Sequence, residues 1–298
     1  QLAMPSSVAL WAGAFAEELL DDLALLDAAY HLNDACPLGS AASYGVPLPL
    51  DREAVAQALG FSRVQNNVLY VNNSRGKVEA VILEAAEQIM LTLSKLAQDL
   101  ILFSLPEFGY FTLPAELFAG SSIMPQKRNP DMLELLRAKT ATVGACCGQV
   151  KAITRALPSG YNRDFQETKG PFLRGLDIAL ASVRMMRLVV DRLAVDEARL
   201  LQGFTPEIYA ADQALELVAG GMSFREAYRE VGRNLERLPA ADPRRILAAR
   251  PYAGSPGNLN LKPAEAALRQ RSARLERRSA DIDRRLAELA GAPISICD

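Results

Sequence analysis

The sequence contains a single histidine, His31, among its 298 residues. Metal centres and histidine-based triads are hard to assemble from one imidazole, because zinc sites usually take several nitrogen or sulfur ligands and a triad needs a histidine beside its nucleophile. We therefore expect no metal site and no cofactor in this chain alone. We interpret His31 as a structural residue at the end of a helix.

Cysteine is also scarce, with four residues in the chain. Their spacing matches no metal-ligand motif, and Cys146 and Cys147, as neighbours on a helix, would point in different directions. We interpret the four cysteines as reduced thiols and predict a cytoplasmic protein. They stand at positions Cys36, Cys146, Cys147 and Cys297.

The chain has little net charge and no long apolar run. A formal net charge of −2 gives no reason to expect nucleic acid as a partner. No apolar segment approaches the roughly 20 residues that span a bilayer as a helix. We expect neither a nucleic-acid partner nor a membrane partner.

Apolar residues instead recur at the three- and four-residue steps of amphipathic helices. The predicted helices cover about residues 7–32, a short segment between the cap Asp51 and Gly60, then 76–105, 130–156 and 166–193. Pro106 ends the third of these, which we predict to be the longest. Helices of this length with wide apolar faces usually pack in bundles and often against partner chains. The sequence predicts an all-α long-helix bundle and an oligomer.

Beyond Gly203 the predicted helices shorten and the loops multiply. Ser223 and Glu226 have the spacing of a capping box. A loop at 253–263 precedes a last, arginine-rich helix, for which we weigh an anion-binding face against a solvated face with local ion pairs and favour the latter. We predict two domains: residues 1–203 form the central bundle with the polar loop described next, and residues 204–298 form a smaller helical C-terminal domain.

One polar stretch, G-S-S-I-M-P-Q-K-R-N-P at residues 120–130, interrupts the helices. Lys127 and Asn129 supply donors suited to a carboxylate or a phosphate, and the loop leads into a helix N-terminus, which also favours anions. Asn129 has the chemistry of a helix cap, and Pro130 and Asp131 suit a first turn. The residues alone leave two interpretations open, an anion-binding loop and a polar connector with an ordinary cap.

A second polar stretch, Y-N-R-D-F-Q-E-T-K at residues 161–169, offers a phenol, an amide and an ammonium group. Gln166 and Lys169 are three residues apart, so on a helix they share a face. The alternative is a helix start with polar side chains that extend to solvent. On the residues alone we favour this second interpretation.

The full spelling of residues 120–130 resembles the signature pattern G-S-S-x-M-P-x-K-x-N-P of the fumarase/aspartase superfamily, with every fixed position met. Within that pattern, Gln126 followed by Lys127 resembles the spelling found in the argininosuccinate lyase family in particular. Three further stretches resemble the same family and extend the likeness over nearly the whole chain, more loosely after residue 203. They are P-L-G-S at 37–40 with P-L-P-L-D-R-E at 47–53, L-A-Q-D-L-I-L-F-S-L-P-E-F-G at 96–109, and the run at 161–169.

The resemblance implies a carbon–nitrogen lyase without a cofactor that eliminates fumarate from a small N-succinyl substrate, argininosuccinate above all. It implies that Ser121 is the general base, that Ser122 shapes the loop or binds substrate, and that Lys127 and Asn129 hold a substrate carboxylate. It further implies that the remainder of the substrate is bound by Tyr161, Gln166 and Lys169. Members of the superfamily are homotetramers whose active sites gather loops from several subunits.

The chain departs from the family pattern in two places. The family carries a Thr-His-x-Gln-x-Ala-x-Pro element, of which residues 1–5 match only the tail; we expect a longer polypeptide, or a separate N-terminal region or chain, to supply the histidine. The stretch N-N-S-R-G-K at 72–77 differs from the family's Ser-x-Arg-Asp, and leaves Arg75 and Lys77 as weaker candidate contacts. Two alternatives therefore stay open: a lyase-fold scaffold without activity, and a lyase for another N-succinyl amino acid.

Overall fold

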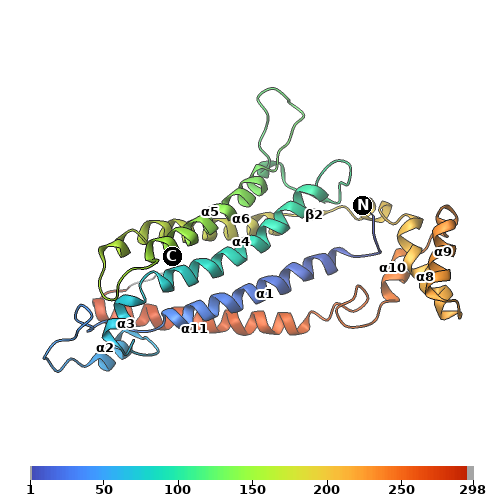
Figure 1. Cartoon of the computed structure of the whole chain (residues 1–298). Coiled ribbons are helices and arrows are strands. Elements are labelled where there is room, and N and C mark those ends of the chain that lie inside the picture. The colour runs from blue at the N-terminus through green and yellow to red at the C-terminus, as the bar shows by residue number, and fades with distance from the viewer. Residues whose placement is uncertain (1, 294–298) are drawn as a thin grey trace.

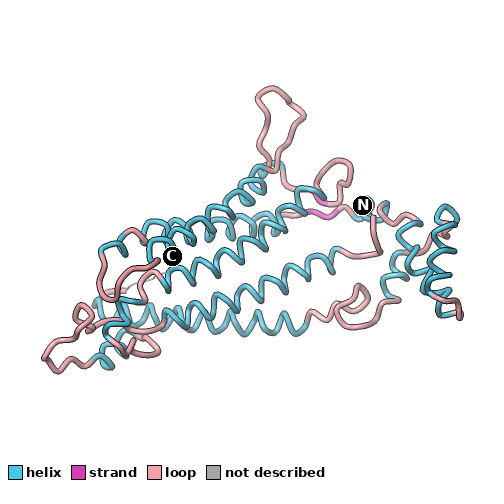
Figure 2. Tube along the Cα trace, viewed as in Figure 1, coloured by secondary structure: helices cyan, strands magenta, loops and turns pink. Residues whose placement is uncertain are grey.

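Figure 1 shows the computed structural model of the chain, which describes residues 2–293. Helices and the loops between them make up nearly all of this part (Figure 2). Two very short strands, β1 (Phe111–Thr112) and β2 (Ala194–Val195), pair antiparallel. The predicted all-α fold class is confirmed.

Long helices run side by side and form the body of the molecule (Figure 1). They are α1 (Val8–Asn33), α4 (Lys77–Phe103), α5 (Asp131–Thr154), α6 (Lys169–Asp191) and α11 (Lys262–Ala290). Helix α4 is central, because it packs against α1, α5 and α6, whereas α11 lies against α1 and α2 (Arg52–Leu59). The prediction that α4 is the longest helix was wrong: α11 has 29 residues and α4 has 27, and the charged surface of α11 hid its length.

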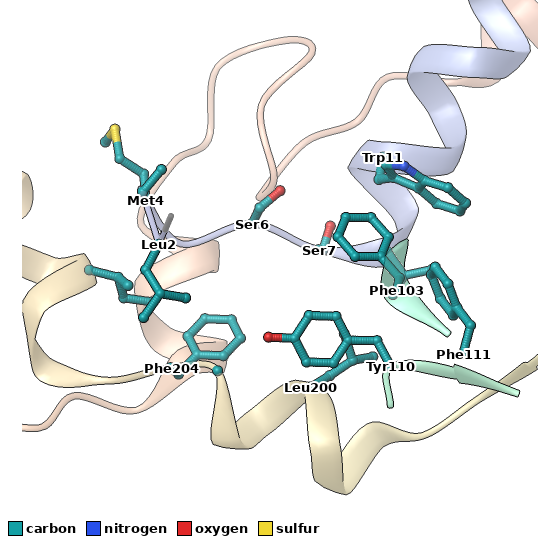
Figure 3. Close-up of a pocket in the computed structure, with 14 residues that line it drawn as sticks. Leu2, Met4, Ser6, Ser7, Trp11, Phe103, Tyr110, Phe111, Leu200 and Phe204 are labelled. Atoms are coloured by element: carbon teal, nitrogen blue, oxygen red, sulfur yellow. The ribbon is translucent and has the colours of Figure 1, made fainter. Parts of the chain in front are cut away.

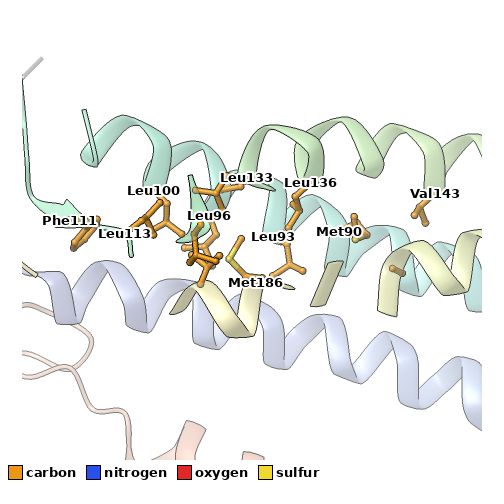
Figure 4. Close-up of a cluster of buried hydrophobic side chains, with 14 of the residues drawn as sticks. Met90, Leu93, Leu96, Leu100, Phe111, Leu113, Leu133, Leu136, Val143 and Met186 are labelled. Carbon is orange, nitrogen blue, oxygen red and sulfur yellow. The ribbon is translucent and has the colours of Figure 1, made fainter. Parts of the chain in front are cut away.

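The main core lies where α4, α5 and α6 meet. Met90 and Leu100 of α4 and Leu133, Leu136 and Val143 of α5 are almost completely buried there (Figure 4). Burying one such side chain contributes roughly 1.5–3 kcal/mol. This shared packing holds the N-terminal half of α5, and a second cluster of Leu83, Cys147 and Val150 holds its C-terminal half.

Helix ends follow local capping chemistry where the predictions rested on it. The Oδ1 atom of Asp51 accepts a hydrogen bond from the Ala54 N–H at 2.8 Å, and Gly60 ends α2 with a left-handed φ of 79°. Only glycine adopts that conformation without steric cost. Helix α4 begins directly after Gly76 and stops before Pro106. These predicted boundaries are confirmed.

Short helices complete the described chain. They are α3 (Val68–Asn73), η1 (Ala115–Leu117), η2 (Arg163–Gln166), α7 (Glu197–Gln202), η3 (Pro206–Tyr209), α8 (Ala210–Ala219), α9 (Phe224–Arg233), η4 (Leu235–Arg237) and α10 (Pro243–Ala248). Ser223 caps α9 as predicted, since its Oγ accepts from the Glu226 N–H at 3.3 Å. Helices α8 and α9 share a small apolar cluster of their own. The domain division at residue 203 stays a prediction.

The arginines of α11 make more than the local ion pairs that we favoured. Local pairs are present within the helix. In addition, Arg271 and Arg274 both contact Asp27 of α1, and Arg278 donates to the Asp34 carboxylate. The predicted solvated face was incomplete, because these partners lie far from α11 in the sequence and no local pattern reveals them.

Candidate active site

Residues 120–130, the signature loop, leave the bundle at the N-terminal end of α5 and project away from it (Figure 1). Two backbone hydrogen bonds close the base of the loop: Ala119 N–H donates to the Asn129 carbonyl at 2.9 Å, and Asn129 N–H donates to the Ala119 carbonyl at 3.0 Å. Ser122 and Lys127 are exposed. The loop thus carries its polar side chains on a closed base, in reach of molecules outside this chain.

Ser121 is the half-buried serine of the loop. Its Oγ accepts hydrogen bonds from the backbone N–H groups of Ile123 at 3.3 Å and Met124 at 3.1 Å. Donors directed at a hydroxyl oxygen favour its negatively charged form. The backbone of the loop therefore supplies part of the environment that a serine base requires.

Asn129 does not cap α5, so this prediction was wrong. The residue before the helix is Pro130, no side chain caps it, and Asp131 begins the first turn. The backbone of Asn129 is instead committed to the pairing with Ala119, which only a folded loop can form. Its side chain makes no capping bond and remains a candidate for binding substrate.

The run at 161–169 lies beyond the C-terminal end of α5. Tyr161, Gln166 and Lys169 are all exposed. Gln166 ends η2 and Lys169 begins α6, so the two side chains belong to consecutive elements rather than to one helix. The prediction that Gln166 and Lys169 share one helical face was wrong, because η2 ends before Glu167 and α6 begins only after Thr168.

Segments distant in sequence hold the Tyr161 end in place. The Gly160 N–H donates to Asn73 Oδ1 at 2.7 Å, directly beside Tyr161. The guanidinium carbon of Arg75 lies 5.6 Å from the centre of the Tyr161 ring and 5.1 Å from that of Phe165. The sequence offered Arg75 only as a weaker candidate contact, within a stretch that departs from the family pattern.

The loop at 37–50 joins the same region through buried polar groups. The Asn72 side-chain amide donates to the Ser43 hydroxyl, and both residues are buried. Three consecutive non-glycine residues, Ala41, Ala42 and Ser43, have positive φ angles of 48°, 53° and 86°. Such backbone is costly and persists only where its surroundings impose it. Sequence reasoning missed this conformation, because alanine gives no signal for it.

The two groups of candidate residues stand at opposite ends of α5. Ser121, Lys127 and Asn129 precede the helix, and Tyr161 follows it. At 1.5 Å per residue, the 24 residues of α5 separate its ends by about 36 Å. One copy of this chain therefore does not bring the two groups together.

Two cavities differ in the ligands they suit. A pocket of about 250 Å³ near the start of α1 is lined by aromatic and aliphatic groups, among them Trp11, Phe103 and Tyr110 (Figure 3). It carries no cation and none of the predicted site residues, so it does not suit an anionic substrate. A cleft of about 810 Å³ beside α3 and α4 is lined by Arg75 and Lys77 among others.

Residues 2–293 contain no cluster of three or more histidine, cysteine or acidic side chains placed to bind a metal ion. No helix in this part of the chain combines the length and apolar character needed to cross a membrane. Cys36, Cys146 and Cys147 are free thiols in buried positions, and burial raises the pKa of Cys147. Cys297 lies outside the described residues.

Residues 1–144 match a family model described as lyase. The chain is 50% identical over 261 residues to the argininosuccinate lyase of Sorangium cellulosum, an alignment that covers 88% of this chain and 60% of the relative. It is 45% identical over 235 residues to the argininosuccinate lyase of Thermotoga neapolitana, covering 79% of this chain and 59% of that protein. The chain spans about 60% of the length of these curated relatives.

Solved structures agree on the fold. The crystal structure of EDDS lyase in complex with formate has a TM-score of 0.81 and 23% sequence identity, covering 97% of this chain and 64% of that one. A class II fumarase from Schistosoma mansoni has a TM-score of 0.63 and 16% identity, covering 81% of this chain and 58% of that one. These solved structures share the fold of this chain, and its curated relatives of 45–50% identity are argininosuccinate lyases.

Proposed function

We propose that this chain is part of a carbon–nitrogen lyase that eliminates fumarate from an N-succinyl compound, with argininosuccinate, which yields arginine and fumarate, as the first candidate. The observation that carries the proposal is the complete signature loop, raised from the bundle with its polar side chains accessible. The argininosuccinate lyase relatives support the same chemistry.

The proposed reaction needs a base and a cationic environment. Ser121 takes the proton from the carbon next to a substrate carboxylate, and the electron pair of that C–H bond forms the double bond of fumarate. The electron pair of the C–N bond leaves with the nitrogen, to which an acid supplies a proton. The abstracted proton is weakly acidic, so preorganised donors on the carboxylate carry much of the barrier reduction. Lys127 and Asn129 are the proposed donors to this carboxylate.

Ser122, Tyr161, Gln166 and Lys169 complete the proposed binding set. Ser122 follows the base on the loop and shapes it around the substrate. The other three present a phenol, an amide and an ammonium group at the far end of α5, where they bind the remainder of the substrate. All four side chains are exposed in this chain, which leaves them available to a ligand.

A complete site on this proposal is built by more than one copy of the chain, as a homotetramer with shared active sites. The separation of about 36 Å along α5 supports this, since it is much longer than an N-succinyl amino acid. An apolar groove of about 830 Å³ bordered by α1, α4 and α6, with Leu180 and Val183 exposed, offers a surface that a further copy would cover. The free thiols of Cys36, Cys146 and Cys147 support a reducing, cytoplasmic location.

The test is release of fumarate by the protein expressed from its complete reading frame, followed by the ultraviolet absorbance of the double bond. Argininosuccinate is the first substrate, and addition of fumarate to a panel of amines tests other leaving groups. Turnover of argininosuccinate supports the proposal, and turnover of another N-succinyl amino acid alone supports the second candidate. A folded protein inactive with every substrate would point to the scaffold alternative.

A further inference from the structure

Arg75 differs from the other half-buried arginines in its contacts. Four of the others pair with aspartates: Arg250 with Asp212, Arg271 with Asp27, Arg278 with Asp34 and Arg285 with Asp281. Arg52 donates to three backbone carbonyls. Within the described residues the Arg75 guanidinium makes no ion pair and no hydrogen bond, and it lies over the rings of Tyr161 and Phe165. A half-buried cation is thus left without an anionic partner.

The donors of Arg75 remain open to a ligand. Among the described residues, the only side-chain polar atoms both fully buried and without a hydrogen bond belong to Thr205 and Arg271. The nitrogens of Arg75 are therefore accessible. Its planar group is held over Tyr161, which is 57% exposed, and Phe165, which is 4% exposed. Stacking on two rings orients the guanidinium and leaves its paired N–H groups for a carboxylate.

The cleft that Arg75 borders is cationic. Its volume of about 810 Å³ lies in the range of small-molecule sites. Arg63 and Lys77 also line it, and the guanidinium of Arg63 is already bonded to backbone carbonyls. Glu79 is the sole acidic side chain on the described lining, and its Oε2 accepts from the Gly76 N–H at 2.7 Å. Arg75 and Lys77 therefore give the cleft an unbalanced positive charge.

We propose that Arg75 binds the carboxylate of the amino acid that leaves, and so selects an amino acid over a simple amine as the leaving group. This inference rests on the proposed lyase function. The carboxylates of the succinyl half are assigned to Lys127 and Asn129 on the signature loop. The anionic group that remains on an N-succinyl amino acid is its own carboxylate, and Arg75 is the unpaired cation stacked on Tyr161 at the other end of α5.

The test compares arginine with agmatine, which is arginine without its carboxylate, by titration calorimetry on the protein from the complete reading frame. The wild type binds arginine more tightly than agmatine. Arg75→Gln lowers the arginine affinity about tenfold or more, the range of a charge-assisted hydrogen bond, and leaves agmatine within about twofold. Arg163→Gln is the matched control, because Arg163 is an exposed cation two residues from Tyr161 that forms no ion pair with the other described residues. It changes neither affinity.

Three results would overturn the proposal: no preference for arginine in the wild type, unchanged arginine binding in Arg75→Gln, or an equal loss for both ligands, which would give Arg75 only a structural role. Arg75→Lys keeps the positive charge but loses the paired N–H donors of the guanidinium, so it should retain part of the preference for arginine. It replaces Arg75→Gln if that variant fails to fold. Fumarate release is measured separately on the wild type. Its absence would reject the lyase function, whereas its presence with a failed Arg75 test would reject only the role of Arg75.

Discussion

The two ends of α5 carry the candidate site residues in opposite structural settings. At the N-terminal end, the signature loop is tied to the chain mainly at its base, through Ala119 and Asn129. At the C-terminal end, Asn73 and Arg75 of distant segments hold the backbone and ring beside them. The first group has few ties to the rest of the described chain beyond its base, whereas distant segments contact the second. The proposed base and its neighbours therefore lie where the described chain constrains them least.

Replacing Ser121 should produce the largest effect on activity. Ser121→Ala removes the proposed base and should lower fumarate release about a thousandfold, within the range for general base catalysis. The melting temperature should not change, because the side chain bonds only to its own loop. Ser272→Ala, on the exposed face of α11, is the control. Turnover at the wild-type rate in the Ser121 variant would remove that residue from the mechanism.

A core substitution between the two ends should produce the next largest effect. Leu136→Ala opens a cavity in the packing of α5 and should cost about 2–5 kcal/mol in the free energy of unfolding, measured by urea denaturation. Leu289→Ala, where the side chain is 56% exposed, should change it by about 0.5 kcal/mol or less. Equal losses in the two variants would contradict the assigned core.

A paired substitution at the two ends should give the smallest but most specific difference. Asn73→Ala removes the acceptor of the Gly160 N–H and should cost about 1 kcal/mol of unfolding free energy. Lys127→Ala, at the exposed loop, should cost nothing measurable by the same denaturation experiment. A loss at Lys127 that matched the loss at Asn73 would show that the loop is held as firmly as the other end.

The parts of the fold that depend on local chemistry could be predicted from the sequence. Asp51, Gly60 and Pro106 mark helix ends through capping, left-handed backbone and a missing N–H, which need no distant partner. Contacts across the chain could not be predicted. Asp27 meets Arg274 although 247 positions separate them. The pairing of Asn129 with Ala119 likewise forms only when the loop has closed.

The candidate site shows the same limit. Its residues could be named through the resemblance of residues 120–130 and 161–169 to a family pattern. The distance between the two groups of candidate residues could not be predicted, because it follows from the length and direction of the folded helix α5 rather than from any motif. Arg75 was a weak candidate in the sequence, and its proposed role rests on the rings it contacts and on the lack of a carboxylate partner among the described residues.

The central claim is that the two ends of α5 serve a site built by different copies of the chain. The direct test is to co-express Ser121→Ala with Lys169→Met from the complete reading frame, after each is measured alone and expected to have little activity, and to measure fumarate release by the mixed oligomers. We predict activity well above that of either variant, because some sites then receive an intact loop from one copy and an intact Lys169 from another. Activity no higher than that of the separate variants, in verified mixed oligomers, would contradict the claim.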